Sequence, residues 1–185
     1  MKVIETSLPG CVIVEPTVFG DGRGFFFETW SAERYGQHSL PTKFVQSNVS
    51  FSSRGVLRGL HYQWPSPQGK LVSVLVGEVY DVVVDIRRGS STFGQWAAVI
   101  LSAENKRQFW IPEGFAHGFA VLSEQAIFSY LCTAQYDKAA DAGIRWNDPA
   151  IGIDWPVSAP VLSAKDEAAP LLADIAPERL PVCAP

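Results

Sequence analysis

About ten short segments of this chain carry the residue pattern of β-strands. They are rich in Val, Ile, Phe, Tyr and Trp, turn residues separate them at close spacing, and helix signals are few. Such a chain is expected to fold as an antiparallel β-sandwich or barrel with few helices. The expected strands are residues 12–14, 25–30, 44–51, 56–62, 70–76, 79–87, 94–101, 107–111, 115–122 and 126–133.

Local signals refine this outline. Gly77 and Glu78 stand between two apolar runs and predict a tight hairpin. Ser31 is a suitable N-cap for a brief helix over 32–35. The 185 residues predict a single domain, residues 1–185, with a real hydrophobic core. From Pro156 onward the chain is rich in Pro and Ala, and we expect this segment to cover one end of the barrel.

The composition excludes several classes of protein. A net charge of −4 makes nucleic acid an unsuitable partner. The N-terminus lacks the apolar run of a signal peptide, and no stretch is apolar enough to span a bilayer. The three cysteines form no Cys-x-x-Cys pair of the kind that binds zinc. These features predict a cytoplasmic protein with reduced thiols.

The stretch from Gly55 to Lys70 is the strongest candidate for a functional site, because it brings together Arg58, His61 and Lys70. On an unbroken strand Arg58 and His61 would face opposite sides, since they are three residues apart. Gly59 lies between them, and an interior glycine often marks a β-bulge that would bring both onto one face. The expected result is a pocket for an anionic substrate.

His61 suits general-base chemistry because the unperturbed pKa of histidine lies near neutrality. The alternative for His61, and equally for His117, is a hydrogen-bonded core histidine, whereas His38 lies in a polar loop and is expected to be solvated. A metal-binding cupin needs a His-x-His pair, but Tyr62 and Gln63 follow His61, so we predict no metal. Nucleotide-binding glycine motifs and a G-x-S-x-G elbow are also missing.

Other polar residues remain ambiguous from the pattern. Glu28 is either an exposed edge residue or a ligand contact. In residues 44–51 the amides of Gln46 and Asn48 share a face, and the pattern alone favours a solvated face over a pocket wall. Asp81 and Asp85 interrupt an apolar run, so they are expected to be paired or to lie at a rim.

Several longer strings resemble one known family. They include F-G-D-G-R-G-F-F-F-E-T-W, F-V-Q-S-N, G-V-L-R-G-L-H-Y-Q, G-F-A-H-G-F and L-S-A-K-D, in this order from about Val12 to Asp166. These strings are similar to the dTDP-4-dehydrorhamnose 3,5-epimerases of bacterial rhamnose synthesis. The resemblance implies a cupin-type jelly-roll homodimer that exchanges N-terminal strands and needs no metal or cofactor. It also implies a substrate, dTDP-4-dehydro-6-deoxy-D-glucose, and a product, dTDP-4-dehydro-L-rhamnose.

The resemblance also implies roles for individual residues. His61 would remove the protons next to the C4 ketone, Asp166 would orient His61, Lys70 would stabilise the enolate, and Tyr130 would return a proton to the opposite face. The implied substrate-binding residues are Arg23, Arg58, His117 and Lys165 near the diphosphate, Glu28, Gln46 and Asn48 near the nucleotide, and Phe19 and Phe26 or Phe27 for stacking on thymine. Ser47, Lys70 and Asp141 are further implied substrate contacts.

Two differences from the family pattern are visible. Asp141 stands where the family has Glu, and Leu131 follows Tyr130 where Lys is common, which removes a charge near the site. Three alternatives stay open: an epimerase that inverts only C3 or C5, a non-catalytic cupin that binds nucleotide sugars, and a metal-dependent cupin oxygenase. Retention of His61, Lys70, Tyr130 and Asp166 together favours catalysis over binding alone.

Overall fold

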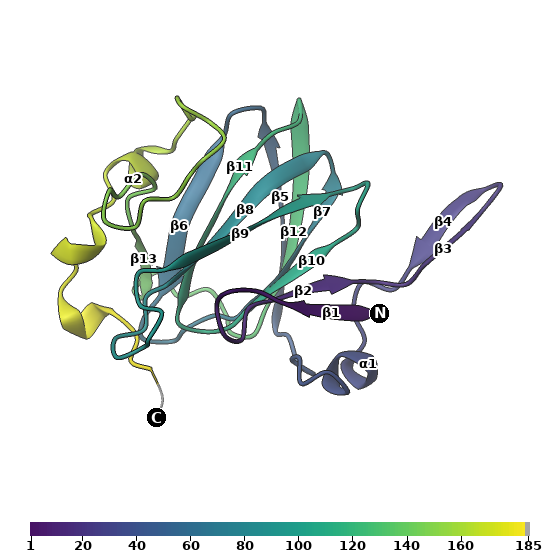
Figure 1. Cartoon of the computed structure of the whole chain (residues 1–185), viewed down its shortest axis with the longest axis horizontal. Coiled ribbons are helices and arrows are strands. Elements are labelled where there is room, and N and C mark those ends of the chain that lie inside the picture. Colours follow the sequence, from purple (N-terminus) through teal and green to yellow (C-terminus); the bar gives the residue numbers. More distant parts are fainter. Residues whose placement is uncertain (184–185) are drawn as a thin grey trace.

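The structure is a computed structural model that describes residues 1–183, and it is a sandwich of two antiparallel sheets (Figure 1). The all-β prediction is therefore confirmed. The six-stranded sheet has the order β1 (Lys2–Glu5), β2 (Val12–Glu15), β10 (Gln108–Ile111), β7 (Lys70–Val76), β12 (Gln125–Cys132) and β5 (Gln46–Ser53). The five-stranded sheet has the order β13 (Asp141–Gly143), β6 (Leu57–Gln63), β11 (Phe115–Val121), β8 (Glu78–Asp85) and β9 (Trp96–Ser102).

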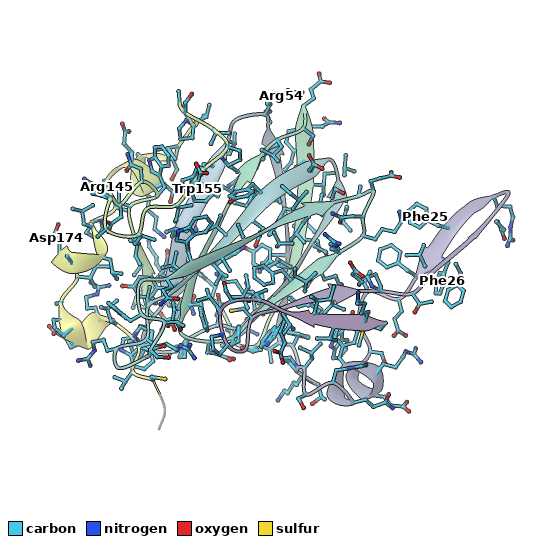
Figure 2. The ribbon with its side chains drawn as sticks, in the orientation of Figure 1. Phe25, Phe26, Arg54, Arg145, Trp155 and Asp174 are labelled. Atoms are coloured by element: carbon cyan, nitrogen blue, oxygen red, sulfur yellow. The ribbon has the colours of Figure 1, made fainter. Side chains whose placement is uncertain are left out.

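A separate hairpin, β3 (Val18–Asp21) with β4 (Gly24–Phe27), projects from the sandwich (Figure 1). Phe25 and Phe26 on this hairpin (labelled in Figure 2) and Phe19 are exposed, and the Phe25 ring lies 4.4 Å from Nζ of Lys106 in the β9–β10 loop. Exposed aromatic side chains on a projecting element are typical of a surface that contacts another protein chain. The sequence predicted a glycine-rich turn before a strand here, and the structure adds the partner strand β3.

Helices are short, as expected. They are α1 (Ala32–Gly36), α2 (Ala164–Glu167) and two 3-10 turns at Leu172–Asp174 and Pro177–Arg179. Ser31 caps α1 by accepting a hydrogen bond from the Arg34 amide, which confirms the predicted N-cap. Ser163 caps α2 in the same way. Among residues 1–183, no helix is long and apolar enough to cross a lipid bilayer.

The predicted hairpin at Gly77 and Glu78 is wrong. Strands β7 and β8 flank this point, but they belong to different sheets and do not pair. Gly77 instead makes a corner between the sheets, with a φ of 80°. A Cβ at this position would lie 2.0 Å from the carbonyl oxygen of Gln125, so only glycine fits.

The main core fills the space between the sheets, where Val72, Val79, Leu101, Phe109 and Phe128 are buried. A second apolar cluster lies on the outer face of the five-stranded sheet and includes Val82, Ile151 and Leu172. There the C-terminal segment packs beside β6 and β13 (Figure 1), and Trp155 meets the ring of Tyr80 (Figure 2). The segment thus covers a sheet face, where the sequence suggested a barrel end.

The buried carboxylate of Asp85 organises the loop that joins β8 to β9. It accepts five hydrogen bonds, from the backbone and guanidinium of Arg87 and from the hydroxyls of Ser90 and Thr92. Burial alone would raise the pKa of Asp85, but these donors outweigh it and lower that pKa to about 2. The expectation that Asp85 is paired is confirmed.

Candidate active site

Two adjoining cavities, of about 210 and 110 Å³, open between the two sheets, and His61, Lys70 and Tyr130 line both of them. The larger cavity is lined by Ser50, Arg58, His61, Lys70, His117, Phe119, Phe128 and Tyr130. The smaller is lined by Gln46, Asn48, His61, Tyr62, Gln63, Gln68, Lys70, Tyr130, Tyr136 and Asp141. Most residues singled out in the sequence therefore meet here.

The predicted bulge at Gly59 is present, and it turns two functional side chains of β6 toward the same cavity. Opposite strand β11 the register places His61 against His117 and Arg58 against Phe119, so β6 holds one extra residue. Arg58 and His61 consequently line the same cavity. Gly59 has a φ of 123°, and a Cβ there would lie 2.6 Å from the Cα of Gly118. Only glycine satisfies both conditions.

Asp166 reaches His61 from helix α2. Its Oδ1 lies 2.5 Å from Nε2 of His61, although the two residues are 105 positions apart in sequence. Burial alone would raise the pKa of Asp166, but the contacts with His61, Ser163 and the Gly59 backbone lower it below its ordinary value. Asp166 is thus an anion at neutral pH, held against the imidazole of a candidate base.

Lys70 stands at the start of β7, with its half-buried side chain in both cavities. Burial lowers the pKa of Lys70, while Cys132, Asp141 and Asp81 raise it in part and the charge of Lys165 lowers it further. A desolvated ammonium of this kind interacts strongly with any negative charge that develops beside it, because little water screens the interaction.

His117 is held by a fully buried carboxylate. Its Nε2 lies 3.0 and 2.9 Å from the two oxygens of Asp81. Burial raises the pKa of Asp81, and the charges of His117 and Lys70 oppose this rise. His117 is therefore the hydrogen-bonded core histidine that the sequence offered as an alternative, and its ring also lies in the wall of the larger cavity.

Tyr130 belongs to β12 in the six-stranded sheet, whereas His61 belongs to β6 in the five-stranded sheet. Both line the space between the sheets, so they approach a bound ligand from opposite walls. Burial raises the pKa of Tyr130, with Cys132 adding to the rise and Arg58 opposing it. The Tyr130 phenol is therefore a neutral proton donor near pH 7.

The amide face of β5 is a cavity wall, and the solvated face that the pattern favoured is wrong. Gln46 donates to Asn48 at 3.0 Å and accepts the backbone N–H of Tyr136 at 2.7 Å. Asn48 in turn contacts Sγ of Cys132 at 3.7 Å. Ser47 alternates with these residues and is exposed on the other face, so its side chain lines neither cavity.

Lys165 and Asp141 form an ion pair at 2.5 Å beside the smaller cavity. Asp141 also accepts a hydrogen bond from the hydroxyl of Tyr136 at 3.1 Å. Asp141 therefore reaches the site despite being shorter than Glu. Leu131 lies on the opposite face of β12 from Tyr130 and packs into an apolar cluster with Leu71, so it replaces no charge inside the cavity.

The chain does not bring the hairpin residues to these cavities. Arg23 pairs with Asp21 at the hairpin, and Glu28 pairs with Arg34 near α1. Phe19 and Phe26 border a separate hollow of about 340 Å³ on the hairpin itself. Within one chain these four residues lie outside the site, which is consistent with a role toward another subunit.

Sequence reasoning missed the residues that support the site. Ser52 accepts a hydrogen bond from Nε of Arg58 at 2.9 Å, and the Phe51 carbonyl accepts one from Nη2 at 3.1 Å. Ser52 alternates with Gln46 and Asn48, which was the available signal. Among residues 1–183, no group of three or more His, Cys, Asp or Glu side chains could hold a metal ion.

Comparisons with known proteins identify the family of this chain. The family model described as dTDP-4-dehydrorhamnose 3,5-epimerase matches residues 5–174. The dTDP-4-dehydrorhamnose 3,5-epimerase of Salmonella typhimurium is 58% identical over 175 residues, which cover 93% of this chain and 96% of that protein.

Solved structures are similar as well. The dTDP-6-deoxy-D-glucose-3,5-epimerase RmlC of Legionella pneumophila, in complex with dTDP-4-keto-L-rhamnose, has a TM-score of 0.97 and 55% identity, covering 100% of this chain and 99% of that one. ChmJ, a 3'-monoepimerase of Streptomyces bikiniensis in complex with dTDP-quinovose, has a TM-score of 0.89 and 36% identity. The match covers 97% of this chain and 92% of ChmJ.

Proposed function

This chain belongs to the dTDP-4-dehydrorhamnose 3,5-epimerase family, and on that premise we propose that it converts dTDP-4-dehydro-6-deoxy-D-glucose into dTDP-4-dehydro-L-rhamnose by inverting C3 and C5. The observation that carries the mechanism is the His61–Asp166 pair at 2.5 Å, which faces Lys70 and Tyr130 in one cavity. Such an arrangement suits proton abstraction beside a ketone.

In the first half of each inversion, His61 takes the proton from the carbon next to the C4 carbonyl. Asp166 orients the imidazole and stabilises the imidazolium that forms, as a carboxylate does for a catalytic histidine. The electron pair left on carbon moves into the carbonyl and makes an enolate. The Lys70 ammonium lies in the same cavity and stabilises the negative oxygen.

In the second half, Tyr130 donates its phenolic proton to the other face of the planar enolate. The positions of His61 and Tyr130 on opposite sheets support this step, because inversion requires removal and return of a proton on opposite faces. The phenolate then recovers a proton from water, and the imidazolium releases one. Atoms and charge balance over the cycle.

The binding residues follow from the same geometry. Arg58 and Lys165 supply cations for the diphosphate, and the Gln46 and Asn48 amides supply hydrogen bonds for the nucleotide. His117 completes the wall of the larger cavity. Binding of the diphosphate would replace the Asp141 carboxylate as the partner of Lys165.

The proposal includes a homodimer in which the β3–β4 hairpin reaches a partner subunit. The hairpin carries Arg23, Phe19 and Phe26 away from the body of its own chain, and Glu28 follows it. An exchange of this element would bring these residues to the partner's cavity. A cytoplasmic location is also part of the proposal, since nucleotide sugars are cytoplasmic metabolites in this kind of synthesis.

Proton NMR in deuterated water tests the reaction. The purified enzyme is incubated with dTDP-4-dehydro-6-deoxy-D-glucose, and a downstream reductase traps the product. We expect deuterium at both C3 and C5 and a dTDP-L-rhamnose product. Deuterium at C3 alone would instead indicate single-centre chemistry like that of the 3'-monoepimerase ChmJ. Absence of exchange would indicate a binding protein.

A further inference from the structure

Two phenylalanine rings belong to the lining of the larger cavity. Phe119 comes from the five-stranded sheet and Phe128 from the six-stranded sheet, and their rings stack with centroids 4.2 Å apart. Both side chains are buried and continue into the main core. The stack therefore gives the cavity a well-packed apolar surface that spans the two sheets.

The rest of the cavity wall is polar. Its other six side chains each carry a hydrogen-bonding group: Ser50, Arg58, His61, Lys70, His117 and Tyr130. Among the described residues that line this cavity, Phe119 and Phe128 are the two that cannot donate or accept a hydrogen bond through a side-chain nitrogen or oxygen. A ligand group that touches the stack must therefore be apolar, or it loses its hydrogen bonds to water.

The substrate of the proposed function has one such group on its sugar, the C6 methyl. This methyl is bonded directly to C5, one of the two carbons that exchange a proton. C5 must lie between His61 on one wall and Tyr130 on the other. When C5 becomes part of the planar enolate, C6 lies in its plane, so the methyl points along the cavity and not toward either wall. The Phe119–Phe128 stack is the apolar surface that this cavity offers to such a group.

We infer that Phe119 and Phe128 are specificity-determining residues that select 6-deoxy sugars over sugars with a C6 hydroxyl. This inference rests on the proposed function. A 6-hydroxymethyl group would press its hydroxyl against two phenyl rings, with no partner for its hydrogen bonds. Discrimination against an added hydroxyl in an apolar pocket amounts to about tenfold to a hundredfold.

The test compares two stable ligands that differ only at C6, dTDP-6-deoxy-D-glucose and dTDP-D-glucose, with dTDP as the reference. Isothermal titration of the wild-type enzyme should give a dissociation constant at least about tenfold lower for the 6-deoxy compound. Phe119→Gln and Phe128→Gln place an amide beside C6, and we expect each to reduce the ratio to near one. Equal affinities in the wild type would overturn the inference.

Matched variants separate specificity from folding. Phe119→Leu and Phe128→Leu keep the surface apolar and should keep most of the preference, even if the glutamine variants fold poorly. Phe115 is a buried phenylalanine of β11, the strand of Phe119, but it packs under Arg87 and does not line the cavity. Phe115→Leu should therefore leave the ratio of the two dissociation constants unchanged. Loss of the preference in the leucine variants would also contradict the inference.

The outcomes distinguish this inference from the reaction itself. Deuterium exchange into the ketosugar reports on the proposed function and does not depend on the two binding constants. Normal exchange with equal affinities would reject only the role of the phenylalanine stack. If neither dTDP-sugar binds better than dTDP, the sugar does not enter this cavity, and the inference fails. A clear preference without exchange would retain the C6 selectivity and reject epimerase activity.

Discussion

At the scale of single residues, the proposed role of His61 as a base depends on its contact with Asp166. An exposed imidazole has no fixed orientation, whereas the contact with Asp166 fixes which nitrogen faces the carboxylate and leaves the other for the cavity. His38 shows the contrast, because it is exposed in a polar loop and contacts no carboxylate in residues 1–183. The same side-chain type therefore has two different roles in one chain.

Replacing His61 with Ala should lower kcat by about a thousandfold or more, because no other base is held beside the reacting carbons. Affinity for dTDP should stay within about threefold of the wild type, since the proposed nucleotide contacts are the Gln46 and Asn48 amides and not His61. Steady-state kinetics and titration with dTDP measure both quantities, and His38→Ala is the control. Ordinary turnover by His61→Ala would rule out the proposed mechanism.

Ser52 should act through Arg58. Removing its hydroxyl in Ser52→Ala frees the guanidinium, so we expect KM and the dissociation constant of dTDP to rise about fivefold with little change in kcat. Affinity for thymidine, which lacks phosphates, should not change. Ser52→Thr should restore binding, and Ser53→Ala, one residue further on the exposed face, should have no effect. Equal losses for dTDP and thymidine would contradict this role.

At the scale of elements, the bulge in β6 is what allows Arg58 and His61 to serve one cavity. Gly59→Ala should destabilise the fold by about 2 kcal/mol or more, because the new Cβ meets the Gly118 backbone and the backbone φ disfavours it. Gly55→Ala is a matched control: its φ is also positive, at 79°, but nothing lies within 4 Å of the added carbon. Urea unfolding should give a clearly smaller loss for Gly55→Ala.

The Asp85 cluster should make the β8–β9 loop sensitive to acid. The pKa of Asp85 is about 2 in the folded state, below its ordinary value of 3.8. The stability that the ionised Asp85 carboxylate contributes is therefore fully present above about pH 4 and is lost as the pH falls toward 2. The difference corresponds to a contribution on the order of 2 kcal/mol.

Unfolding in urea as a function of pH measures this contribution. Asp85→Asn should lose stability at pH 7 and should show a weaker decline between about pH 4 and pH 2 than the wild type. Asp174→Asn, an exposed carboxylate on the C-terminal segment (Figure 2), is the control and should behave as the wild type. An unchanged acid profile in Asp85→Asn would show that the cluster contributes little.

Local patterns predicted the strands and the bulge because both depend on neighbouring residues. The alternation in residues 44–51 correctly assigned Gln46 and Asn48 to one face of the strand and Val49 to the other. It could not tell which face points inward, because here the inner face borders a polar cavity. The turn signal at Gly77 was real, yet a turn does not specify whether the strands beside it share a sheet. No periodicity relates His61 to Asp166, so the residues alone could not pair them; only the family resemblance did.

At the scale of the whole molecule, the outer face of the six-stranded sheet carries several exposed apolar side chains. Val49, Phe51 and Leu75 are 64%, 57% and 47% exposed on neighbouring parts of this sheet, and the hairpin adds exposed phenylalanines. A surface of this kind is typical of a subunit interface. It supports the proposed homodimer, in which the hairpin of one subunit would complete the site of the other.

Phe51→Glu should therefore weaken the dimer, because it places a charge within the apolar face. Sedimentation velocity should show a shift from dimer toward monomer, with a parallel loss of activity if the partner's hairpin completes the site. Ala150→Glu adds the same charge at an exposed position on the C-terminal side and should leave the dimer intact. A monomeric wild-type protein with full activity would reject the exchange.

The contact between helix α2 and β6 can form only late during synthesis of the chain. His61 leaves the ribosome 105 residues before Asp166, an interval of about 5 to 20 s at ordinary rates of translation. During this time both sheets can form almost completely, but the imidazole has no carboxylate. A chain cut short of α2 would keep the strands of both sheets but would lack Asp166 and the apolar cover of the five-stranded sheet, so we expect it to be inactive.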